Sequence, residues 1–105
     1  MNKSLVSLMA MMGVLLATPV WAKDVEVRIK EFMYNAKSLT VPVGTTVTWI
    51  NDDDTPHTVT EKHKLFRSAA LDTKDKYFYT FKKRGKFEYF CTLHPNMVGT
   101  ITVTK

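Results

Sequence analysis

Apolar and polar side chains alternate along several short stretches of this chain, which is the periodicity of half-buried β-strands. In the first such stretch, Val25, Val27 and Ile29 alternate with charged residues, so one face is expected to pack inward. Further stretches dense in β-branched and aromatic residues predict strands over Ser38–Val41, Thr45–Ile50, His57–Thr60, Tyr77–Phe81, Phe87–Cys91 and Gly99–Lys105. Residues 61–76 show no clear period.

Turn residues separate these stretches and indicate the fold class. Pro42-Val43-Gly44 ends one predicted strand, and Gly85 lies in the loop of a predicted hairpin. About seven or eight short strands, without a convincing helix, predict an all-β fold, a Greek-key sandwich or barrel of antiparallel sheets. A length of 105 residues supports one domain.

The N-terminal segment departs from the strand pattern. Lys3 precedes an uncharged, largely apolar segment that ends at Ala22, with Pro19 near its end. This predicts a secretory signal peptide over residues 1–22, cleaved after Ala22, and a periplasmic domain over residues 23–105. The alternative is an uncleaved anchor over Ser4–Ala22, which nearly reaches spanning length, but Pro19 argues against it.

Charge argues against nucleic acid as a partner. Removal of residues 1–22 takes away one lysine and no acid, so the formal net charge falls from +5 to +4. The basic residues are spread along the chain, and no basic motif interleaved with aromatic residues is present. An acidic partner surface fits this balance better. We expect a solvated turn at the basic run Lys82-Lys83-Arg84. We expect another at Asp52-Asp53-Asp54, because these acids lack the spacing of a calcium loop.

Three potential metal ligands, Cys91, His94 and Met97, follow the last aromatic stretch at three-residue intervals. If Tyr89 faces the core, strand alternation points Cys91 the same way. His57 follows a polar loop at a strand end and could supply a second imidazole. Two imidazoles, one thiolate and a weak thioether are the donors of a blue copper site, whereas a Met ligand argues against zinc.

Other functions of these residue types are less favoured. His63 lies among charged residues and is expected to be a solvated loop residue, and Met33 is expected in the core. A thiol-hydrolase triad could be formed by residues of the types of Cys91, His57 and Asn51. That interpretation leaves His94 and Met97 unexplained. One Cys and three His exclude a disulfide framework, a dinuclear copper centre and a multicopper enzyme within this chain. We therefore expect a protein that is not an enzyme.

Two segments resemble the cupredoxins: Asn51 with Pro56-His57-Thr58-Val59, and Tyr89–Met97 with Gly99. The Cys-x-x-His-x-x-Met loop is most similar to that of the amicyanin group, in which it commonly reads C-T-P-H-P-x-M. Leu93 stands where that group usually has Pro, and the exported chain is shorter at its N-terminus. The resemblance implies a cupredoxin-like fold and one copper ion, with strong ligands His57, Cys91 and His94, a weak axial ligand Met97, and Asn51 bracing the ligand loops.

The resemblance also implies a role. It points to a monomeric periplasmic type 1 copper protein that carries one electron between partners, with no membrane attachment after signal cleavage. Amicyanin-like partners would be a methylamine-oxidising dehydrogenase as donor and a c-type cytochrome as acceptor. The edge of the His94 ring should reach an apolar patch that includes Leu93, Pro95 and Met97. A copper carrier or delivery protein without an electron-shuttle role is the alternative.

Overall fold

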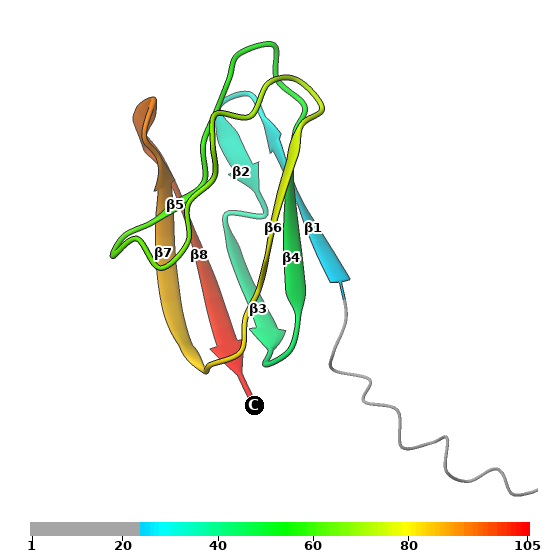
Figure 1. Cartoon of the computed structure of the whole chain (residues 1–105), viewed down its shortest axis with the longest axis vertical. Coiled ribbons are helices and arrows are strands. Elements are labelled where there is room, and N and C mark those ends of the chain that lie inside the picture. The colour runs from blue at the N-terminus through cyan, green and yellow to red at the C-terminus, as the bar shows by residue number, and fades with distance from the viewer. Residues whose placement is uncertain (1–23) are drawn as a thin grey trace, which may run out of the picture.

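The computed structural model describes residues 24–105, which form two β-sheets packed face to face (Figure 1). The strands are β1 (Asp24–Lys30), β2 (Met33–Asn35), β3 (Ser38–Pro42), β4 (Thr46–Asn51), β5 (Thr60–Glu61), β6 (Lys76–Thr80), β7 (Gly85–Cys91) and β8 (His94–Thr104). Within this range there is no α-helix, and hence none that could cross a membrane. The predicted signal peptide, residues 1–22, lies outside the described residues.

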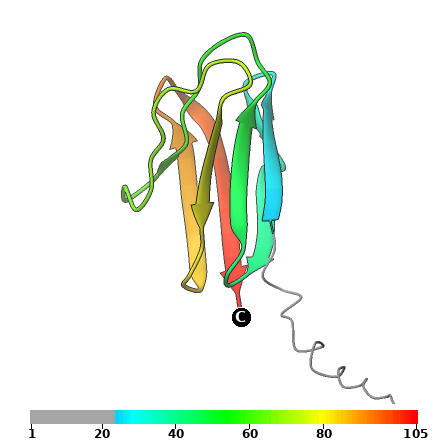
Figure 2. The same cartoon turned by 45° about the vertical axis from the view of Figure 1, so that its right-hand side comes forward.

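Each sheet has four strands, in the orders β2-β1-β4-β6 and β3-β8-β7-β5. Figure 2 shows the two layers from a second angle. The predicted all-β fold is confirmed, and the sheets are mixed rather than purely antiparallel. β1 pairs with β4, and β3 with β8, in parallel, whereas the other pairs are antiparallel. Parallel neighbours arise because the chain passes to the other sheet between the two strands of each such pair.

The core lies between the inner faces of the two sheets. Strand alternation explains which side chains enter it: Val27 and Ile29 on β1 are fully buried, and the charged residues between and beside them are not. Trp49 on β4 packs across the interface against Tyr89 on β7, with ring centroids 5.3 Å apart. Aromatic rings therefore fill the centre of the sandwich, next to the end of β7 where Cys91 lies.

Several predicted strand positions differ from the observed ones. The predicted strand over residues 57–60 is wrong in extent. Only its last residue, Thr60, belongs to a regular strand (β5), and His57 forms an isolated bridge to Leu71. β2 was not predicted, and the expectation that Met33 lies in the core is wrong. Met33 is 56% exposed because the alternation of β2 turns Tyr34 inward instead. β8 begins at His94, five residues before the predicted start.

Two connections at one end of the sandwich bring distant parts of the sequence together. One is the tight turn between β7 and β8, in which Cys91 pairs with His94. The other is the irregular segment over residues 52–59, which follows β4. In Figure 1 both lie toward the upper end, away from the C-terminus. Three of the predicted metal ligands, His57, Cys91 and His94, therefore lie at this end.

Candidate metal centre

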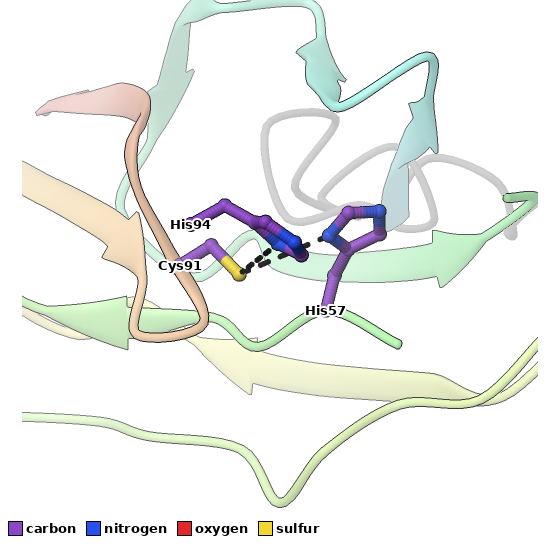
Figure 3. A group of neighbouring side chains, drawn as sticks. All are labelled: His57, Cys91 and His94. Carbon is purple, nitrogen blue, oxygen red and sulfur yellow. Dashed lines mark hydrogen bonds between the residues drawn. The ribbon is translucent and has the colours of Figure 1, made fainter. Parts of the chain in front are cut away.

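Three of the predicted ligands converge at this end of the sandwich. His57, Cys91 and His94 each offer one donor atom, and these atoms lie within 4.8 Å of one another. The Cys91 Sγ atom is 3.8 Å from Nδ1 of His57 and 3.7 Å from Nδ1 of His94. Figure 3 shows both imidazoles turned toward the sulfur atom. One thiol and two ring nitrogen atoms, from two segments far apart in the sequence, therefore converge.

Met97 lies on β8 and points into the core, where it belongs to the same buried cluster as Cys91. It is only 5% exposed, so its predicted place in the surface patch is wrong. Its thioether is instead buried in the core together with Cys91. Leu93 and Pro95 are exposed as expected, and His94 is half-buried between them.

The Cys91 sulfur atom is fully buried and accepts a hydrogen bond. The backbone N–H of Thr58 donates to it over 3.3 Å. The register of β7 against β8 shifts between Phe90 and Cys91. A backbone donor at a thiolate stabilises its negative charge and fixes its direction.

Thr58 also ties the two ligand loops together. Its hydroxyl oxygen accepts from the backbone N–H of Thr92 over 2.8 Å and lies 2.9 Å from the Thr92 hydroxyl. Its carbonyl oxygen accepts from the Tyr34 hydroxyl over 2.7 Å. Burial, together with nearby Cys91 and Tyr89, raises the pKa of Tyr34 far above its ordinary value, so Tyr34 remains a neutral donor. The segment around His57 is thereby held against both β2 and the β7–β8 turn.

Asp53 orients the buried ring of His57, and its predicted place in a solvated turn is wrong. Its side chain is 10% exposed, and Oδ2 lies 2.8 Å from Nε2 of His57. Burial acts to raise the pKa of Asp53, but hydrogen bonds from the backbone N–H groups of Phe32 and Glu31 and from His57 outweigh it and lower the pKa. An ionised carboxylate only accepts, so Nε2 carries the proton and Nδ1 keeps a lone pair for a metal.

Asn51 braces the loop that leads to His57. Its Nδ2 atom donates to the carbonyl oxygens of Thr55 (3.0 Å) and Leu71 (2.8 Å), and its Oδ1 atom accepts from the backbone N–H of Asp53 (2.9 Å). The amide contacts backbone groups and not His57, so the thiol-hydrolase triad is not assembled. His63 is also outside the centre, because its side chain is 82% exposed beside Glu61.

Thr58, Asp53 and Phe32 are the residues that sequence reasoning missed. Thr58 had one signal, its position next to His57. Asp53 had another, since a carboxylate four residues before His57 in a turn is within reach of the ring. Phe32 had none, because it reaches the centre only through the fold, where its ring contacts both imidazoles.

The donor set fits copper. Two imidazole nitrogen atoms, one thiol and a buried thioether match the soft, mixed set that a type 1 copper centre uses. The Nε2 atom of His57 is hydrogen-bonded to Asp53, and the Cys91 sulfur accepts from the backbone N–H of Thr58. Hydrogen bonds of this kind to the ligands are usual around metal sites.

Several known proteins are similar to this chain in sequence or in structure. The profile of the cupredoxin-like domain family matches residues 5–103. Amicyanin of Paracoccus versutus is 35% identical over 92 residues, which cover 83% of this chain and 70% of that protein. A purple cupredoxin from Nitrosopumilus maritimus superposes with a TM-score of 0.72 at 35% identity, covering 77% of this chain and 100% of that chain. The Cu(I) form of an amicyanin variant also gives 0.72, at 33% identity, covering 76% and 81%. The chain therefore belongs to the cupredoxin-like family and is similar to amicyanins.

Proposed function

We propose that this protein is a type 1 copper protein that carries one electron at a time between redox partners. The cofactor is one copper ion per chain. His57 and His94 would hold it through Nδ1, Cys91 through Sγ and Met97 through its thioether. The observation that carries this proposal is the convergence of three donor atoms within 4.8 Å of one another, on two buried residues and one half-buried residue.

The residues around the candidate ligands favour electron transfer, because they hold the ligand side chains in place. Copper supplies a site that takes up and releases one electron. Asp53 holds the His57 ring, Thr58 holds the Cys91 sulfur, and Asn51 holds the loop between them. Donors fixed in this way keep nearly the same geometry for Cu(I) and Cu(II), so little reorganisation accompanies each transfer.

His94 is the group through which electrons leave and enter. It is half-buried, and Leu93, Pro95 and Phe32 beside it are exposed. Leu93 is 50% exposed and Phe32 46%, so exposed apolar side chains lie beside His94 in the sequence and in the fold. Interfaces of this kind are small and release their partner quickly, as an electron carrier requires.

Location and partners follow from the N-terminal segment, the charge and the similarity to amicyanins. The chain is exported to the periplasm, is cleaved after Ala22 and acts there as a monomer without enzymatic activity of its own. A methylamine-oxidising dehydrogenase is the proposed donor and a c-type cytochrome the acceptor. The net charge of +4 after cleavage favours acidic partner surfaces.

A copper titration tests the proposal. Protein expressed from the full chain is purified from the periplasmic fraction, its mass is measured to locate the cleavage site, and Cu(II) is added while the visible spectrum is recorded. We expect an intense blue band that saturates at one copper per chain and bleaches reversibly with ascorbate. The Cys91→Ser variant should lack it, whereas the His63→Ala control should keep it.

A further measurement on the copper-loaded protein separates electron transfer from copper delivery. An electron carrier keeps its copper through repeated redox cycles in the presence of a chelator, whereas a delivery protein loses it within the first cycles. A weak or non-stoichiometric band would contradict the proposed ligand set.

A further inference from the structure

The tip of the β1–β2 hairpin has an unusual backbone. Lys30 pairs with Met33, so Glu31 and Phe32 form a two-residue loop, with φ angles of 52° and 58°. Loops with positive φ at both positions are normally filled by Asn-Gly, because larger side chains are unfavourable in the left-handed region. Local preference therefore does not explain Glu-Phe at this place, and the reason lies in what the loop contacts.

Asp53 holds this loop tip in place. One carboxylate oxygen accepts from the backbone N–H of Glu31 over 2.7 Å, and the other accepts from that of Phe32 over 2.9 Å. The second oxygen is also the one bonded to Nε2 of His57. Two neighbouring N–H groups that converge on an anion stabilise a left-handed turn. A single carboxylate thus joins the hairpin tip to a proposed metal ligand.

The position of the hairpin tip puts the Phe32 ring against both imidazoles. Its centroid is 5.0 Å from that of His57 and 4.7 Å from that of His94, with interplanar angles of 86° and 82°. The two imidazole centroids are themselves 5.0 Å apart, so the three rings form a nearly equilateral triangle. Edge-to-face contacts of this kind are favourable beyond the area they bury.

We propose that Phe32 is a positioning residue that closes the metal centre, and that Asp53 keeps it there. Phe32 holds the imidazoles of His57 and His94 over the Cys91 sulfur atom whether or not metal is bound. It thereby shields the sulfur from small solutes and slows the loss of the metal. The inference rests on the proposed ligation by the two histidines, but its effect on the metal-free protein is independent of copper.

The test measures how accessible the Cys91 thiol is in the metal-free protein. Iodoacetamide, which alkylates thiols, is added to the native apoprotein, and the modified fraction is followed by mass spectrometry. We expect Phe32→Ala to be alkylated about tenfold faster than the wild type, since two aromatic contacts are lost. Phe32→Leu, which keeps apolar bulk, should lie between them. Phe78→Ala removes an aromatic ring that is 67% exposed on β6 and should not change the rate.

Copper loss provides a second readout. Loaded with one copper per chain, Phe32→Ala should retain the blue band and lose it to EDTA about tenfold faster than the wild type. If both rates in Phe32→Ala stay within about twofold of the wild type while circular dichroism shows a native fold, the proposal is overturned. Absence of a blue band in the wild type would instead overturn the proposed function, and the alkylation result would still decide the role of Phe32.

A double variant tests the part played by Asp53. Asp53→Asn keeps the shape of the side chain but replaces one acceptor oxygen with a donor, so it should accelerate alkylation. If Asp53 acts partly through Phe32, the combined Phe32→Ala, Asp53→Asn variant is alkylated more slowly than the product of the two single effects predicts. A rate equal to the product of the two single effects would show that Asp53 acts on His57 alone, and would overturn this part.

Discussion

Thr58 is the residue on which the two halves of the metal centre depend. Its N–H group bonds the sulfur of Cys91, its hydroxyl bonds the backbone of Thr92, and its carbonyl oxygen accepts from Tyr34. Two of these three bonds use backbone atoms and survive any substitution that leaves the chain path unchanged. Only the hydroxyl is open to a clean test.

Replacement of Thr58 by Val should destabilise the apoprotein. The variant keeps the shape of the side chain and both backbone bonds, but the partly buried N–H of Thr92 loses its acceptor. Loss of such a bond costs about 1 kcal/mol. Urea denaturation followed by tryptophan fluorescence measures the difference. Thr40→Val, on the exposed side of β3, is the matched control, and equal unfolding free energies for the two variants would contradict the role of the hydroxyl.

At the scale of elements, the pairing of β7 with β8 leaves no room for a side chain at one position. Tyr89 and Gly99 are register partners. A Cβ atom on Gly99 would lie 2.4 Å from Cζ of Tyr89, too close for any real contact. The Tyr89 ring is 1% exposed and packs against both Trp49 and Tyr34.

Gly99→Ala should therefore strain the β7–β8 pair. Forcing an additional carbon into a packed core costs about 1–3 kcal/mol, and the displaced Tyr89 lies two residues before Cys91. We expect a lower urea midpoint in the apoprotein and a shifted or weakened blue band in the copper form. Thr100→Ala, one residue further along β8, should leave the band in place. An unchanged midpoint in Gly99→Ala would show that Tyr89 is less firmly held than its burial indicates.

Local pattern was sufficient to predict most strands and the convergence of His57, Cys91 and His94. Alternation placed Val27 and Ile29 inside β1, and the spacing of the Cys91 turn brought His94 to the thiol. β2 escaped prediction because three residues are too short to display a period. Asp53 was misplaced because nothing near it in the sequence shows that the hairpin tip of β1 and β2 covers its carboxylate. Contacts between loops from different parts of the chain are a property of the fold.

At the scale of the whole molecule, stability is linked to pH through Glu61. Its carboxylate is buried and accepts from the backbone N–H groups of His63 over 2.7 Å and Leu65 over 2.9 Å. Burial acts to raise the pKa of Glu61, but these two bonds and the neighbouring His63 outweigh it, so the pKa lies below its ordinary value of 4.5. A group with a lowered pKa stabilises the fold above its unfolded pKa, and that stability is lost as pH falls through the folded pKa.

Glu61→Gln should therefore destabilise the apoprotein in a pH-dependent manner. The difference in thermal midpoint from the wild type should be constant at neutral pH and shrink as pH falls below 4.5, the ordinary pKa, where the wild-type carboxyl becomes neutral as well. Calorimetry of both proteins across this range measures it. Glu26→Gln, on the exposed face of β1, should show little difference at any pH. A gap that widens in acid would reverse the assigned sign.

The central place of β8 determines when the molecule can become functional. β8 lies between β3 and β7 and carries both His94 and Met97, although it is the last described strand that the ribosome makes. A nascent chain therefore holds at most His57 and Cys91 of the four candidate ligands until β8 has been made. The complete set of candidate ligands therefore depends on β8, and a chain truncated before residue 94 lacks His94 and Met97 together with the strand that joins β3 to the rest of its sheet.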